Sequence, residues 1–201
     1  MPKNMQILLC SLLIAGTFSG CKKGEDDPAL SLYSRKARLA GEWTLKQRTL
    51  KYVEQGMYSS FSLTSVYADG LVNETVIMAE TPWPADTNQS SFAYAQTNTF
   101  EKDGSYQEVT VGPNGTSTEE GVWSFIKKSQ QNDLQNKEAI LLTPRKITGK
   151  YNNEIIAGSY HPKVYVLKQL KNKHMTWTSA TSTGSANWGL QSMDATYTFE
   201  Q

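Results

Sequence analysis

The amino-acid sequence predicts an all-β fold, an antiparallel meander that closes into a barrel of about eight to ten strands behind one short N-terminal helix. Three observations favour it. Asp69-Gly70, Asp103-Gly104 and Asn114-Gly115 are dipeptides typical of two-residue hairpin turns. Apolar and polar residues alternate in the segments between such turns. Nothing beyond residue 41 has the helical periodicity that crossovers between parallel strands require.

The first expected element is a single short helix over residues 28–40. Asp27 suits an N-cap position and Pro28 suits the first helical position. Gly41 can end the helix. Small or apolar residues recur at helical spacing, at Leu30, Tyr33, Ala37 and Ala40.

Strands are expected from about residue 41 onward. Trp123 and Phe125 share one face of their segment, and Met175 and Trp177 share one face of theirs. The last segment places Met193, Ala195, Tyr197 and Phe199 on one face. Alternation of this kind indicates half-buried strands, so these residues, together with Trp43, are expected in the core. A fourth turn is expected at Lys171-Asn172-Lys173. The expected strands lie near 41–53, 57–67, 71–79, 91–102, 105–112, 119–128, 138–146, 163–171, 174–182 and 191–200.

Residues 1–20 are predicted to be a signal peptide. An apolar stretch at 7–18 follows a head that contains Lys3; it is shorter than the roughly 20 residues that span a bilayer and fits a secretory signal. Phe18-Ser19-Gly20-Cys21 resembles the bacterial lipobox, although Phe18 stands where leucine is usual. The resemblance implies cleavage before Cys21 and lipidation of Cys21. The alternative is an ordinary signal peptide followed by an incidental cysteine.

The mature chain is predicted to consist of a flexible tether at 21–28 and one domain at 29–201. Loss of the signal peptide removes Cys10, and lipidation uses Cys21, so the domain has no thiol for a disulfide or a nucleophile. Removal of Lys3 leaves nineteen basic and nineteen acidic residues. This balance argues against a nucleic-acid partner, which would need a basic surface.

Short motifs resemble those of a known barrel family. Gly41-Glu42-Trp43 resembles the Gly-x-Trp opening of lipocalin-type barrels, in which the tryptophan plugs the base. Further motifs resemble lipocalin-like lipoproteins of the Bacteroidota, namely Thr99-Phe100 with Asp103-Gly104 and Tyr106, then Gly121, Trp123 and Phe125, then the apolar strand at 139–142. The resemblance implies a lipocalin-like barrel in the cell envelope, anchored in the outer membrane. The start at residues 21–27 also resembles the acidic tether that helps Bacteroidota lipoproteins reach the outer surface, which implies surface exposure, whereas Lys22 and Lys23 leave an inward-facing placement in the outer membrane open.

Catalytic and metal-binding patterns are not evident in the sequence. His161 and His174 show no ligand spacing, so no metal and no cofactor are predicted. No nucleophile elbow occurs. Glu119 and Glu120 are neighbours in a strand, so they face opposite sides and do not suit a glycosidase pair. The protein is therefore predicted not to be an enzyme.

Two tryptophans are the candidate ligand-binding residues. Trp83 lies between Pro82 and Pro84, and Trp188 lies in a glycine-containing loop. Each could line the rim of a pocket or simply pack onto the domain.

The predicted function is non-catalytic binding of a small apolar or amphipathic ligand by a membrane-anchored barrel. The alternative is a structural or interaction lipoprotein with a filled barrel that contacts envelope glycan or protein. An integral membrane barrel is disfavoured, because Thr44, Lys46 and Arg48 are expected on the face opposite Trp43 and Leu45.

Overall fold

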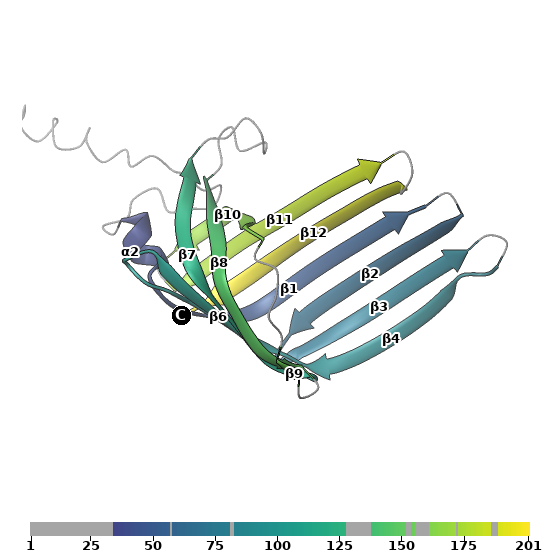
Figure 1. Ribbon diagram of the computed structural model, residues 1–201, viewed down its shortest axis with the longest axis horizontal. Coiled ribbons are helices and arrows are strands. Elements are labelled where there is room, and N and C mark those ends of the chain that lie inside the picture. The colour runs from purple at the N-terminus through teal and green to yellow at the C-terminus, as the bar shows by residue number, and fades with distance from the viewer. Residues whose placement is uncertain are drawn as a thin grey trace, which may run out of the picture.

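The computed structural model describes residues 34–56, 58–80, 83–127, 138–151, 154–155, 161–171, 173–185 and 189–201 (Figure 1). One helix, α2, spans Arg35–Leu39. The strands are β1 (Gly41–Gln55), β2 (Ser59–Ala68), β3 (Leu71–Glu80), β4 (Asp86–Ala93), β5 (Ala95–Phe100), β6 (Ser105–Gly112), β7 (Gly115–Lys127), β8 (Glu138–Tyr151), β9 (Glu154–Ile155), β10 (Lys163–Lys171), β11 (His174–Ser185) and β12 (Gly189–Glu200).

Eight of these strands form a closed antiparallel barrel. The strand order runs β1, β12, β11, β10, β8, β7, β6 and β5, and β5 returns to β1. The predicted fold class, an antiparallel barrel with one short helix, is therefore confirmed. Because the barrel is closed, strand segments that pair on both sides have no free edge.

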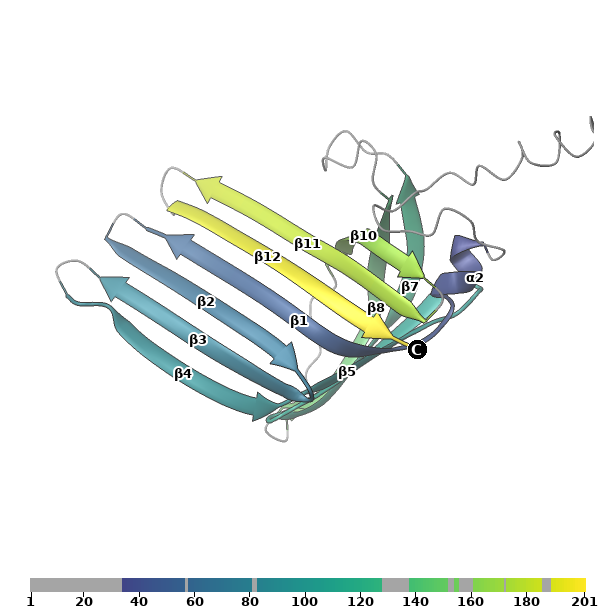
Figure 2. The same ribbon diagram turned by 180° about the vertical axis from the view of Figure 1, so that it is seen from behind.

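The remaining large strands leave the barrel as a flat extension, which we call the wing: β2, β3, β4 and the second half of β1. β1 pairs with β5 through Gly41–Thr44 and then with β2 through Gln47–Gln55. A bulge between Leu45 and Gln47 accompanies this change of neighbour. Figures 1 and 2 show the wing strands running away from α2 and the C-terminus.

Because of this bulge, the expected outward orientation of Arg48 is wrong. Strict alternation from Trp43 would place Arg48 outside, but the extra residue shifts the pattern by one position. The guanidinium of Arg48 instead lies over the ring of Tyr94, 5.0 Å from its centroid, and donates to Ser65 Oγ over 3.1 Å. Ser65 itself is buried, so Arg48 lies on the inner face.

One predicted turn has the expected geometry, and two differ. Asp69 and Gly70 both have positive φ, 52° and 83°, and connect β2 to β3 directly. The Asp103-Gly104 turn is longer, because Glu101 N–H donates to the carbonyl of Ser105 and only Gly104 has positive φ. In the third hairpin Gly112 pairs with Gly115, so the central residues are Pro113 and Asn114.

Helix α2 is shorter than predicted. Ser34 is extended and caps the helix, accepting from Ala37 N–H over 3.1 Å, so one continuous helix through residue 34 is wrong. The expected start at Asp27 and Pro28 lies outside the described residues. Trp43 is fully buried, and its indole N–H donates to the carbonyl of Leu39 over 2.7 Å. This bond fastens α2 over one end of the barrel.

Aromatic side chains fill the barrel near α2. Trp177 lies at the centre, with Tyr165 stacked on it at 4.7 Å and Phe199 packed edge-on at 4.7 Å. The buried hydrophobic core comprises Leu39, Trp43, Leu45, Tyr67, Val72, Phe100, Tyr106, Trp123, Ile140, Leu142, Leu167, Leu170, Met175, Trp177 and Phe199. The aromatic residues predicted for the core are either in this cluster or, for Phe125 and Tyr197, packed against it.

Candidate functional site

A group of charged and polar side chains lies inside the barrel, on the inner faces of β5, β6, β7 and β10. Glu108 on β6 is directly opposite Glu119 on β7 in the strand register. Lys163 on β10 reaches both: its Nζ lies 2.9 Å from each carboxylate oxygen of Glu119 and 3.7 Å from Glu108 Oε1. The ammonium therefore lies between two carboxyl groups that the pairing of β6 and β7 places side by side.

Hydrogen bonds extend this cluster on both sides. The Tyr106 hydroxyl donates to Glu119 Oε1 over 2.7 Å. Gln96 Nε2 donates to Glu108 Oε2 over 2.9 Å, and the Tyr94 hydroxyl donates to Gln96 Oε1 over 3.2 Å. We call Tyr94, Gln96, Tyr106, Glu108, Glu119 and Lys163 the interior polar network. It runs from the aromatic core toward the wing.

Burial perturbs the acid–base behaviour of this network. Burial raises the pKa of Glu108, and the adjacent Glu119 carboxylate raises it further against the opposing charge of Lys163. Burial alone would lower the pKa of Lys163, but Glu108 and Glu119 together outweigh burial and raise it. Burial also raises the pKa of Tyr94 to about 12 and that of Tyr106 above its ordinary range, where the bond to Glu119 adds to the effect.

A pocket of about 400 Å³ adjoins the network at the end of the barrel away from α2. Thr110 and Gly112 of β6 and Ser117 of β7 line it from the barrel side, on the same strand faces as Glu108 and Glu119. Glu74 and Phe92 line it from the wing. Tyr94 belongs to both pocket and network, since its hydroxyl bonds to Gln96 while its ring faces the pocket. The pocket thus has an aromatic wall, a glycine-rich wall and a single lining carboxylate among the described residues.

Glycine at position 121 creates the close packing beside this site. Gly121 is opposite Tyr106 in the register, and a Cβ added there would lie 2.7 Å from Tyr106 Cε1 and would also clash with the carbonyl of Thr143. The absence of a side chain lets the Tyr106 ring lie flat across β7, where its hydroxyl reaches Glu119. Gly121, the glycine of the Gly-x-Trp motif that ends at Trp123, therefore positions Tyr106 in the interior polar network.

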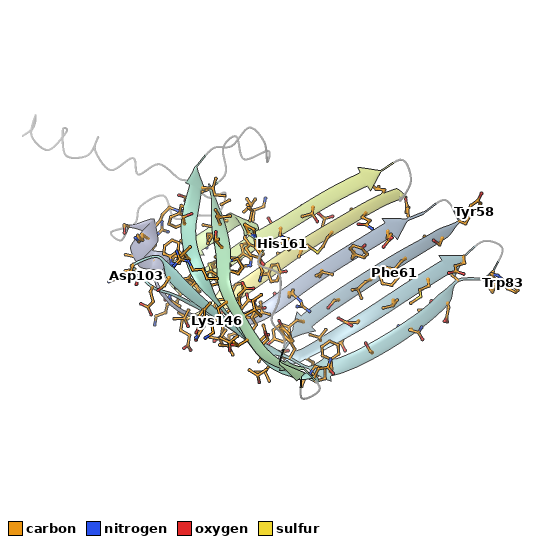
Figure 3. All side chains as sticks on the ribbon, viewed as in Figure 1. Tyr58, Phe61, Trp83, Asp103, Lys146 and His161 are labelled. Carbon is orange, nitrogen blue, oxygen red and sulfur yellow. The ribbon has the colours of Figure 1, made fainter. Side chains whose placement is uncertain are left out.

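Of the predicted site residues Cys21, Trp83 and Trp188, the structure describes Trp83. Trp83 is 72% exposed at the tip of the β3–β4 hairpin, and Figure 3 shows it beside the far end of the wing, like Tyr58. It does not line the pocket described above. Cys21 and Trp188 lie outside the described residues. His161 is exposed just before β10, and His174 begins β11 opposite Glu200.

Glu108, Lys163 and the inward position of Glu119 were not predicted from the sequence. The inference about neighbours was sound, since Glu120 faces outward toward Lys146, 3.5 Å away, while Glu119 is buried. The pairing of Glu108 with Glu119 follows from a turn centred on Pro113 and Asn114, whereas the expected turn at Asn114-Gly115 would have placed Glu108 opposite Gly121. The position of Lys163 in the barrel could not be predicted from the sequence, because it depends on the long-range pairing of β10 with β8.

The fold and the site define a closed eight-stranded antiparallel barrel with an ion-paired interior and a pocket at one end. Comparisons of the chain with protein-family models, with curated proteins and with solved structures find no match. In the part of the chain that the structure describes, no helix has the length and hydropathy needed to cross a membrane.

Proposed function

We propose that the protein is a lipoprotein of the cell envelope, anchored in the outer membrane through Cys21, whose barrel binds a small amphipathic molecule without transforming it. The pocket at the end of the barrel is the observation that carries the ligand proposal. Its volume of about 400 Å³ falls within the roughly 300–1,000 Å³ of small-molecule sites. The lipobox-like Phe18-Ser19-Gly20-Cys21 supports the anchor.

The chemistry of the lining favours an amphipathic ligand. Phe92 and Tyr94 offer aromatic surface to an apolar portion. Gly112, Gly115 and Gly149 add no side chains to the lining, so a flat or extended group can approach the backbone at these positions. Glu74 and the hydroxyls of Thr110 and Ser117 accept hydrogen bonds, which suits a ligand whose polar end carries donors.

The interior polar network supports binding over catalysis. Glu119 accepts from both Tyr106 and Lys163, and Glu108 accepts from Gln96 while it faces Lys163. Acid–base catalysis needs a group within hydrogen-bond reach of a substrate proton. Here the two carboxylates are already engaged by neighbouring side chains. The network is better suited to holding Tyr94 and the barrel wall in one geometry.

A pocket-filling variant tests the ligand proposal. Thr110→Phe should fill the pocket, whereas Thr64→Phe, an exposed position on the outer face of β2, is the matched control. The probe is the fluorescent dye 1-anilinonaphthalene-8-sulfonate, followed by its displacement with dodecylamine, whose ammonium suits Glu74. Saturable binding by the wild type and the control, weakened about tenfold or more in Thr110→Phe, would support the proposal. Equal binding by all three proteins would contradict it.

A second function is favoured by the filled barrel base and by the exposed wing. Aromatic residues occupy the interior near α2, and the wing strands carry many exposed side chains on both faces. These features suit an envelope interaction protein that contacts glycan or protein. Native mass spectrometry of protein purified from its own host separates the two functions. A retained small molecule supports ligand binding. A chain that carries no small molecule but co-purifies with a macromolecule supports the interaction protein.

A further inference from the structure

The outer edge of β4 is a free sheet edge among the described residues. β4 stands at one end of the strand order, and among the described residues it pairs only with β3. That pairing continues from Leu71 opposite Ala93 to Met78 opposite Asp86 without any register shift. Every residue of β4 except Phe92 is exposed. The strand therefore presents one free edge along its whole length.

The register identifies the backbone groups that this edge leaves free. The Tyr94 N–H donates to the carbonyl of Gly70 over 3.0 Å, so hydrogen-bonded pairs with β3 fall on even-numbered residues of β4. The alternation of an antiparallel ladder then directs the N–H and C=O groups of Thr87, Gln89, Ser91 and Ala93 away from β3. These four residues can bond to another strand without disturbing the existing sheet.

Nothing within β4 protects this edge in the usual ways. Sheet edges are commonly blocked by lysine, by proline, by a bulge or by an inward-pointing charge. Residues 86–93 contain no basic residue and no proline, and their only charge is Asp86 at the start. The pairing with β3 is regular, so no bulge twists the edge away.

We propose that two copies of the chain pair through β4, antiparallel to each other, about a two-fold axis at Ser90. In this register Thr87 faces the partner copy at position 93, and Gln89 faces it at position 91, so all four free residues are used. The alternative register, centred on Gln89, would leave Ala93 opposite a residue before the strand begins. In the proposed register Asp86 faces no like charge. The wings of both copies then form one continuous sheet.

The pairing is expected to be weak in dilute solution. Edge pairing buries little surface compared with the roughly 1,200–2,000 Å² of stable interfaces. A dissociation constant on the order of 10–100 μM is therefore expected. A covalent test of the register does not require a tight complex.

The first experiment traps the register with single cysteines. The background carries Cys10→Ser and Cys21→Ser, so the introduced cysteine is the only thiol. Ser90→Cys places two thiols across a non-hydrogen-bonded pair, with Cα atoms about 4.5 Å apart, within disulfide range. Ser91→Cys is the matched control, because its two copies would lie about 8 Å apart, too far for a disulfide. Mild oxidation should give at least tenfold more linked dimer with Ser90→Cys. Equal yields, or adducts only with other proteins, would overturn the proposal.

The second experiment removes the free edge. Ser91→Pro deletes an N–H that points away from β3, so the β3–β4 ladder stays intact. Ser90→Pro is the contrasting variant, because it deletes an N–H that bonds to β3 and so disrupts the β3–β4 ladder. Sedimentation velocity at several hundred micromolar should show dimer for the wild type and monomer for Ser91→Pro, with an unchanged melting temperature. A monomeric wild type, or a Ser91→Pro variant that still dimerises, would overturn the proposal.

Discussion

The Nζ atom of Lys163 lies 2.9 Å from both carboxylate oxygens of Glu119 and 3.7 Å from Glu108 Oε1, so one ammonium contacts two glutamates inside the barrel. The two glutamates are side by side because β6 and β7 pair in a register that Pro113 and Asn114 set. Their side chains are 14% and 8% exposed for Glu108 and Glu119, whereas that of Lys163 is 35% exposed. The cluster therefore has its acids inside and its base toward solvent.

Lys163→Met should destabilise the fold most strongly at neutral and alkaline pH. Removing one partner of a buried ion pair costs about 3–5 kcal/mol, and the partial exposure of Lys163 reduces the expected cost to roughly 2–3 kcal/mol. The pKa of Glu108 is already raised by burial and by Glu119, and loss of the opposing ammonium should raise it further above its unfolded value. Protonation of Glu108 at low pH then removes the charge repulsion, so the difference in melting temperature between variant and wild type should shrink as the pH falls through the raised pKa of Glu108. Thermal melts across pH measure this, and a difference that is constant across pH would contradict it.

Ionisation of the buried tyrosines should coincide with alkaline unfolding. Burial raises the pKa of Tyr94 to about 12 and raises those of Tyr106, Tyr165 and Tyr197. A folded pKa above the unfolded value near 10 means that each group contributes stability below that value and loses it as the pH rises through the folded pKa. These buried tyrosines should therefore ionise together with alkaline unfolding. Tyrosinate absorbance and circular dichroism recorded together test this, and full ionisation near pH 11 with the fold intact would contradict it.

Local patterns predicted most of the strands because side-chain alternation and turn residues act over a few positions. Residues 105–112 and 163–171 were predicted as strands with the bounds of β6 and β10. Residues 91–102 were predicted as one strand, but the chain divides there at Tyr94, where it passes from β4 in the wing to β5 in the barrel. No local signal marks that passage, since both strands have β-type sequences.

Long-range pairing accounts for what the sequence could not predict. The wing exists because β1 exchanges β5 for β2 along one edge, and nothing in residues 41–55 shows which partner each half takes. The interior polar network was missed because alternation assigns charged residues to the outside. Glu108 and Glu119 nevertheless lie inside, where Lys163, distant in sequence, forms ion pairs with both. Long-range pairing also determines the place of the predicted ligand residue Trp83. Its loop belongs to the wing, so Trp83 is exposed on a hairpin tip.

Gly121→Ala should test the packing of Tyr106 across β7. The added methyl group would lie 2.7 Å from Tyr106 Cε1, and the Tyr106 ring, only 3% exposed, has little room to move. Overpacking of this kind costs about 1–3 kcal/mol. Gly112→Ala is the control, because its nearest contact is an ordinary 3.8 Å to Tyr94. Chemical denaturation should separate the two variants, and equal stabilities would contradict the assigned role of Gly121.

Cys21→Ser should release the protein from the membrane or leave its signal peptide uncleaved. The expectation follows from Phe18-Ser19-Gly20-Cys21 and from the durable attachment that two or three acyl chains provide. Detergent-phase partitioning and palmitate labelling measure the change, with Cys10→Ser as the control that keeps the anchor. A Cys21→Ser protein that still labels with palmitate would show that the anchor assignment is wrong.

Trp123→Ala and Trp83→Ala should differ sharply in stability. Trp123 is 6% exposed, its indole N–H donates to the carbonyl of Glu101 over 3.0 Å, and its ring packs edge-on against Phe100 at 5.9 Å. Truncating such a residue costs about 3–5 kcal/mol, a large part of the roughly 5–15 kcal/mol that stabilises a domain. Trp83 is 72% exposed, so its truncation should change the free energy of unfolding by no more than about 0.5 kcal/mol. Denaturant titration of both variants tests this. A large loss in Trp83→Ala would mean that Trp83 packs against the domain, and a negligible loss in Trp123→Ala would contradict the inward orientation of β7.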